Sequence, residues 1–183
     1  GRPMQAPFRL LQTLRGTVEL GLLLATGVAT ATFVATPLIL PAVAARFDIG
    51  TGSAGLFSAA QLGLFVVGSW GAPRLFEPSR RLFVGSLLAL ASASCTSILA
   101  PEFSVLVASR ALAGLSLGVL TWLAYSQVFG DTERTGDVAV IGPLTGVLAA
   151  PLIGVALQAG DDRTVFAILA VLALVPLSSI PQF

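Results

Sequence analysis

The sequence contains no histidine, no lysine and one cysteine, and charged residues make up only 10% of its 183 positions. A soluble domain usually carries about 25% charged residues, so the composition argues against a water-soluble domain. Because zinc, haem and iron–sulfur clusters are normally held by histidines and grouped cysteines, we expect no metal and no cofactor. The lone Cys95 cannot form an intrachain disulfide. A net charge of +1 is too small to favour a nucleic-acid partner.

Hydrophobic residues make up 55% of the chain and form six long stretches without charge. Each stretch reaches roughly the 20 residues that a helix needs to cross a bilayer, and none alternates as a membrane strand would. We therefore predict an all-α integral membrane protein, with the lipid bilayer as its surroundings. It comprises a cytoplasmic segment over residues 1–16 and a bundle of six transmembrane helices over residues 17–183. The predicted helices cover residues 17–43, 53–72, 82–99, 103–129, 138–159 and 164–180.

The arginines predict the orientation of the bundle. Those that fall on the side of the two termini are Arg2, Arg9, Arg15, Arg74, Arg80, Arg81 and Arg134, whereas Arg46 and Arg163 fall on the other side. Because basic residues are enriched in cytoplasmic loops, we expect both termini to be cytoplasmic in a multi-pass protein of the cell membrane. The predicted loops are short, which leaves no room for a catalytic domain outside the membrane.

A faint internal similarity relates the two halves of the chain. The third predicted helix opens with Arg81-Leu-Phe-Val, and the sixth opens with Arg163-Thr-Val-Phe. The two segments continue as SLLALA and ILAVLA. An inverted repeat of three plus three helices accounts for this similarity, and so does chance likeness between apolar helices; the sequence leaves both open.

Four segments follow one another in a characteristic order. They are TPLILPAVAARFDIG at residues 36–50, RALAGLSLG at 110–118, GPLTGVLAAPLIG at 142–154 and DRTVF at 162–166. This series resembles the amino-terminal six-helix half of a major facilitator superfamily transporter. The resemblance covers nearly the whole chain and implies a second six-helix half, with the fifth helix at the interface between the halves.

One segment departs from that family. After the second helix the family usually has an aspartate–arginine pair, but here Pro73 precedes Arg74. In the family this loop takes part in a charge network that steadies one conformation. Arg74, Arg80, Arg81 and Arg134 are therefore candidates for such a cytoplasmic loop network, or simply anchor the ends of helices.

Arg110 is the principal candidate functional residue. It lies about seven residues into the fourth predicted helix, where a charge costs roughly 2.5–3.5 kcal/mol on insertion scales. It is expected to face a cavity, where it would hold an anionic group of a substrate or couple to proton movement, as the resemblance implies. The alternative is that its long side chain reaches the interface. Gly114 and Gly118 follow on the same helix face, and we expect them to leave space there.

The fifth predicted helix carries a stripe of small residues, namely Gly142, Gly146, Ala150 and Gly154. Small residues at four-residue spacing let another helix approach closely, so we expect a partner to dock here. Pro143 and Pro151 each remove a backbone hydrogen bond and can kink the helix.

Several other polar residues are candidates for a solute path. Gln61 and Tyr125 could line a polar cavity, or bond to their own or a neighbouring helix. Glu19, beside Arg15, either forms an interfacial ion pair or carries protons. Because no nucleophile, base and orienting group occur together, we expect no enzymatic activity.

These features predict one half of a secondary active transporter that moves a small solute by alternating access. The expected partner is a second six-helix half, a second copy of the chain or another membrane subunit. The alternative function is a non-transporting subunit that packs in a larger membrane complex and stabilises it.

Overall fold

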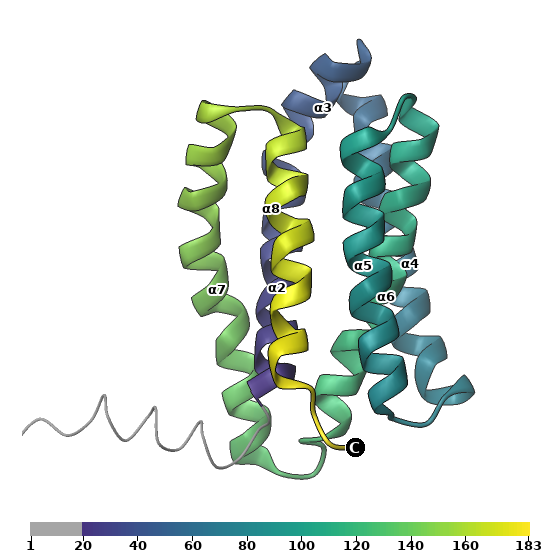
Figure 1. The fold of residues 1–183 in the computed structure, drawn as a ribbon, viewed down its shortest axis with the longest axis vertical. Coiled ribbons are helices and arrows are strands. Elements are labelled where there is room, and N and C mark those ends of the chain that lie inside the picture. The colour runs from purple at the N-terminus through teal and green to yellow at the C-terminus, as the bar shows by residue number, and fades with distance from the viewer. Residues whose placement is uncertain (1–19) are drawn as a thin grey trace, which may run out of the picture.

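The structure, a computed structural model, describes residues 20–183, apart from the side chain of Glu133. Helices run side by side along the long axis of the molecule, and the C-terminus lies at the end opposite α3 (Figure 1). The elements are α2 (Leu20–Leu38), α3 (Leu40–Phe47), α4 (Thr51–Leu75), α5 (Arg80–Leu99), α6 (Phe103–Ser126), α7 (Thr132–Ala159), α8 (Asp162–Leu174) and the 3₁₀ helix η1 (Val175–Ser179). Six candidate membrane spans occur in this part of the chain, which confirms the predicted six-helix membrane bundle.

Prolines account for two differences from the predicted helix boundaries. The first predicted helix is divided into α2 and α3 at Ile39, two residues before Pro41. Pro41 donates no backbone hydrogen bond and is favoured in the first turn of a helix, so a break just before it is expected. The last span changes from α-helix to 3₁₀ helix at Val175, beside Pro176. Residues 17–19 of the first predicted helix, including Glu19, lie outside the described residues.

The start of α7 also differs from the prediction. The helix begins at Thr132 rather than at Val138, so Arg134 belongs to its first turn and not to a loop. The side chain of Asp131, just before the helix, accepts a hydrogen bond from the backbone N–H of Arg134. An acidic residue in this position satisfies a free N–H at the helix start, so the helix extends into a charged segment that we expected to be a loop.

The helices pair in a way that links the two halves of the chain. α4 of the first half packs on α6 of the second, α2 packs on α7, and α5 packs on both α6 and α8. Exchanging the first three spans with the last three relates the α4–α6 pairing to the α7–α2 pairing, but the close α5–α6 pairing has only a weak counterpart in α8 and α2. The packing thus leaves the three-plus-three repeat open.

α6 lies in the closest contact with α4, and glycines explain why. A Cβ atom added at Gly114 would lie 2.8 Å from the carbonyl carbon of Gln61, and one at Gly118 would lie 2.7 Å from the backbone nitrogen of Ser69. The two backbones touch, so no larger residue fits at these positions. The space that we expected Gly114 and Gly118 to leave is thus filled by α4.

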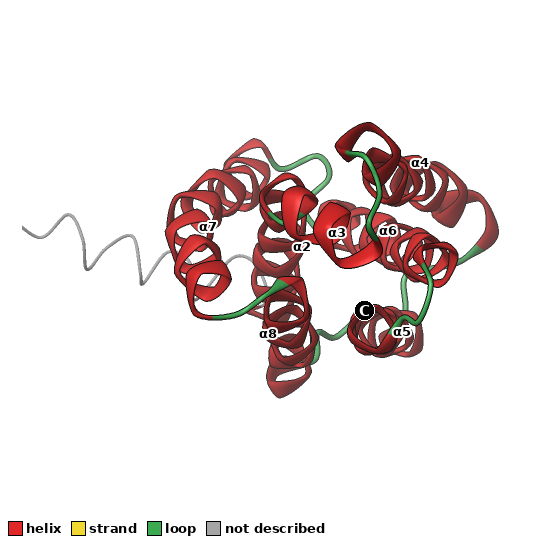
Figure 2. Cartoon of the chain, turned by 90° about the horizontal axis from the view of Figure 1, so that it is seen from above, coloured by secondary structure: helices red, strands yellow, loops and turns green. Residues whose placement is uncertain are grey.

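α4 and α7 form the two outer flanks of the bundle (Figure 2). These two helices have the smallest buried share of the six spans, 22% for α4 and 17% for α7. Large apolar side chains that are exposed on them include Leu62, Val66, Val67 and Trp70 on α4 and Val140, Leu144, Val147, Leu148, Leu152 and Val155 on α7. In a membrane such faces contact lipid tails or another helix.

Candidate functional site

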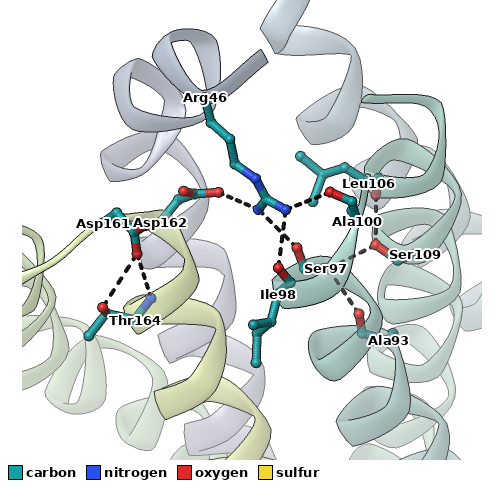
Figure 3. A network of polar contacts seen from close by, with 10 residues as sticks. All are labelled: Arg46, Ala93, Ser97, Ile98, Ala100, Leu106, Ser109, Asp161, Asp162 and Thr164. Atoms are coloured by element: carbon teal, nitrogen blue, oxygen red, sulfur yellow. Dashed lines mark hydrogen bonds and ion pairs between the residues drawn. The ribbon is translucent and has the colours of Figure 1, made fainter. Parts of the chain in front are cut away.

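A buried ion pair closes one end of the bundle. Arg46, at the end of α3, donates a hydrogen bond from Nη1 to Oδ2 of Asp162 in the first turn of α8, at 2.9 Å (Figure 3). Only 10% of the Arg46 side chain and 2% of the Asp162 side chain are exposed. The contact joins the end of α3, which follows the first span, to the start of the sixth span.

Arg46 also donates hydrogen bonds to the backbone carbonyl oxygens at the end of α5. Its Nη1 donates to the carbonyl oxygen of Ser97 at 3.0 Å, and its Nη2 donates to those of Ile98 and Ala100 at 3.1 and 2.7 Å. The last carbonyls of a helix have no partner within the helix, and Pro101 prevents α5 from continuing. One guanidinium, with its several donors, therefore connects α3, α5 and α8. Sequence analysis assigned Arg46 no role beyond orienting the chain and belonging to the segment at residues 36–50, because no local pattern shows that these three helix ends meet.

Arg110 lies deeper in the bundle and has few partners. It is 1% exposed, and its Nη2 donates a long hydrogen bond of 3.4 Å to Oγ of Ser94 on α5. Its Cζ lies 5.0 Å from the ring centroid of Phe166 on α8, which allows a cation–π interaction. Within the described residues, its Nε has no hydrogen-bond partner and no carboxylate pairs with it. The bundle covers this side chain, so it does not extend to the surface of the described part of the chain.

A second buried polar contact joins α2 and α4. Gln61 is fully buried, and its Nε2 donates to Oγ1 of Thr36 at 3.1 Å. Thr36 in turn donates to the carbonyl oxygen of Thr32 at 2.8 Å. Oε1 of Gln61 has no partner among the described residues. The backbone of Gln61 touches Gly114, which lies about one helical turn from Arg110 along α6.

Other sequence candidates lie away from this region. Tyr125 is 37% exposed and lies about 22 Å from Arg110 along α6. The candidate arginines occur near the opposite end of the bundle: Arg74 lies over the ring of Trp70 at 3.9 Å, Arg80 and Arg81 are exposed, and Arg134 pairs with Asp131 at 3.2 Å. The structure therefore places these arginines at helix ends.

The small-residue stripe of α7 has two parts. A Cβ atom added at Gly142 or Gly146 would come within 3.5–3.6 Å of Thr30 or Val34 on α2. The first part of the stripe thus packs inside the bundle, and this differs from the expected docking of a partner along its whole length. No neighbouring atom lies within 4 Å of the added Cβ at Gly154, and Ala150 is half-buried while Pro151 is exposed.

The fold and the buried polar side chains define a helical multi-pass membrane protein. The MFS-type transporter ppzB of Metarhizium rileyi is 32% identical to it over 148 residues, which cover 73% of this chain and 30% of the relative. The MFS-type transporter ppzB of Metarhizium majus is 33% identical over 128 residues, covering 66% of this chain and 27% of the relative. The chain thus spans less than a third of the length of these curated relatives. No family model matches the chain, and no solved structure matches it significantly.

The chain belongs to the major facilitator superfamily, and its six spans form a half of that fold. The resemblance read from the four sequence segments is thereby confirmed.

Proposed function

We propose that the chain is one half of a secondary active transporter, which moves a small solute by alternating access together with a second six-helix bundle. The observation that carries this proposal is Arg110, a buried cation that no carboxylate neutralises among the described residues. A buried charge without a partner is strongly unfavourable, and in a membrane protein it normally serves binding or the coupling of ions.

The unpaired donor and acceptor near the bundle centre support the same proposal. Nε of Arg110 and Oε1 of Gln61 are both buried and without partners in the described part of the chain. Leaving a buried polar group unsatisfied costs about 1–3 kcal/mol, so a group retained in this state is expected to meet a ligand, a proton or water in another conformation. Arg110 is the residue that we assign to solute binding or ion coupling, with Gln61 as a second candidate.

The second bundle is proposed to cover the flanks formed by α4 and α7. Both faces are apolar, and the relatives are more than three times as long as the part that matches this chain. The second part of the α7 stripe, where an added Cβ at Gly154 would meet no neighbouring atom, would let a helix of that bundle approach closely. We further propose that both termini are cytoplasmic, because seven arginines lie on that side of the predicted topology and two on the other.

A transport assay tests this function. The chain alone and the chain joined to a second six-helix bundle are reconstituted into vesicles that contain a pH-sensitive dye, and a panel of small organic solutes is added. We expect solute-dependent proton or solute flux only with both bundles. We expect it to fall at least about tenfold in Arg110→Gln, because the charge is lost, with Arg163→Gln as the matched control.

One observation favours the alternative function, a non-transporting membrane subunit. Pro73 stands in the last turn of α4, where the family usually has the aspartate of its loop network, and Glu77 is exposed in the short loop that follows. A subunit that no longer changes conformation would not need that network. Absence of flux for every solute, with stable association of the two bundles, would favour this alternative.

A further inference from the structure

We propose that Asp162 is a counter-ion shared by Arg46 and Arg110, and that its carboxylate passes from Arg46 to Arg110 when α3 moves away from α8. The proposal concerns the internal charges of the bundle and does not rest on transport. Its basis is an imbalance: the buried guanidinium of Arg110 and the largely buried one of Arg46 both lie between α5 and α8, and Asp162 is the buried carboxylate among the side chains that the structure describes.

The two arginines lie at successive positions along the contact between α5 and α8, here called the outer level and the inner level. At the outer level, Arg46 contacts Asp162 on α8 and the carbonyl oxygen of Ser97 on α5. At the inner level, Arg110 contacts Phe166 on α8 and Ser94 on α5. The two levels thus use the same pair of helices.

One helical turn separates the two levels. Asp162 and Phe166 are four residues apart on α8, so they share a face and lie about 6 Å apart along the axis. Ser97 and Ser94 are three residues apart on α5, or about 4.5 Å along the axis. Such a distance lies within the range of a change in the rotamer of an arginine side chain.

A hydrogen bond between serines connects the levels. Oγ of Ser97 lies 2.8 Å from Oγ of Ser109, the residue that precedes Arg110 on α6. Figure 3 shows this bond beside the contacts of Arg46. A shift of α3 that pulls on the end of α5 therefore has a direct path to the backbone that carries Arg110.

The partners of the two arginines are unequal, which makes an exchange feasible. Without Asp162, Arg46 keeps three backbone carbonyls as acceptors. Arg110 has only the long bond to Ser94 and the ring of Phe166. Transfer of the carboxylate would leave Arg46 partly satisfied and give Arg110 the charge partner that it lacks.

α3 is the element that would move. It has eight residues, it is separated from α2 at Ile39, and it carries both Pro41 at its start and Arg46 at its end. Pro37 and Pro41 donate no backbone hydrogen bond. α3 is therefore tied to α2 through Ile39, which donates to the carbonyl oxygen of Ala35 in α2 and accepts a hydrogen bond from an N–H in α3.

A double-mutant cycle tests the sharing of Asp162. Unfolding of the chain in detergent micelles is followed by titration with sodium dodecyl sulfate for Arg46→Gln, Arg110→Gln and the double variant. If Asp162 pairs with Arg110 once Arg46 is removed, the loss of stability caused by Arg46→Gln should be smaller while Arg110 is present. We expect Arg46→Gln to raise the unfolding constant at least about threefold more in the Arg110→Gln background than in the original chain.

Two controls separate sharing from other effects. The same cycle in the Asp162→Asn background should lose its coupling, whereas direct repulsion between the arginines would persist there. Arg163→Gln, at the exposed arginine beside Asp162, should combine additively with Arg110→Gln. Additive behaviour of Arg46→Gln and Arg110→Gln, or coupling that survives in Asp162→Asn, would overturn the proposal.

A proximity measurement covers the case in which the double variant does not fold. Cysteines are introduced by Arg110→Cys and Asp162→Cys together with Cys95→Ser, and a short rigid bismaleimide is added in native membranes. We expect crosslinking within the chain, and none when the second cysteine comes from Asp161→Cys, whose native side chain is exposed and caps α8 through Thr164. Failure of the first pair to crosslink contradicts the required reach.

Discussion

Replacing Gly114 with alanine should weaken the bundle at the contact between α4 and α6. An added Cβ would lie 2.8 Å from the carbonyl carbon of Gln61 and closer still to its oxygen, whereas ordinary contact begins near 3.4 Å. Both sides of the contact are backbone, so no rotamer change relieves the overlap and α4 must move by about half an ångström or more. Overpacking of this kind costs about 1–3 kcal/mol.

The helix propensity of alanine opposes part of this loss. Alanine favours a helix over glycine by about 0.8–1.0 kcal/mol, so the net destabilisation by Gly114→Ala should be about 0–2 kcal/mol, and about 1–3 kcal/mol relative to the same substitution at a glycine without contacts. Gly63→Ala is the matched control, because no atom lies within 4 Å of its added Cβ on the exposed face of α4. It should be neutral or stabilising by up to about 1 kcal/mol.

Unfolding in detergent micelles, followed by circular dichroism during titration with sodium dodecyl sulfate, measures both variants. The two substitutions add the same methyl group to a glycine in a helix, so their difference reports the tertiary contact alone. Equal stability of Gly114→Ala and Gly63→Ala would refute the assignment of Gly114 to a backbone contact.

Three further predictions use other parts of the bundle. Gly146→Leu should loosen α7 from α2, because the added side chain meets Thr30 and Val34; unfolding measures this loss of stability. Gly154→Leu should leave the bundle stable and weaken its association with a second bundle, which crosslinking measures. Gln61→Leu should change stability by less than about 1 kcal/mol or increase it, because it removes a buried oxygen without a partner while Thr36 keeps its bond to Thr32; a loss of several kcal/mol would show that Oε1 is satisfied after all. In a chain carrying Cys95→Ser, a membrane-impermeant maleimide should label Thr51→Cys from outside the cell and Glu77→Cys only after the cells are opened; the reverse pattern would invert the proposed topology.

The membrane class, the six spans and the family could be predicted from the sequence, because each depends on local properties. A run of about 20 apolar residues specifies a membrane helix whatever surrounds it. The four segments between Thr36 and Phe166 likewise carried the family resemblance by their order along the chain. Burial of Arg110 was not predicted, since an arginine near the end of a span is equally compatible with a cavity, the interface or the interior.

What only the tertiary structure decided is which distant residues meet. Arg46 and Asp162 are 116 positions apart, and each looks like an ordinary charge at the end of a helix until the ends of α3, α5 and α8 are placed together. Gly114 looked like a source of open space and instead is the point where the backbone of α4 fits. A small residue allows a close approach and a charge allows an ion pair, but neither specifies the residue that it will contact. That partner is determined by how the helices pack over the whole bundle.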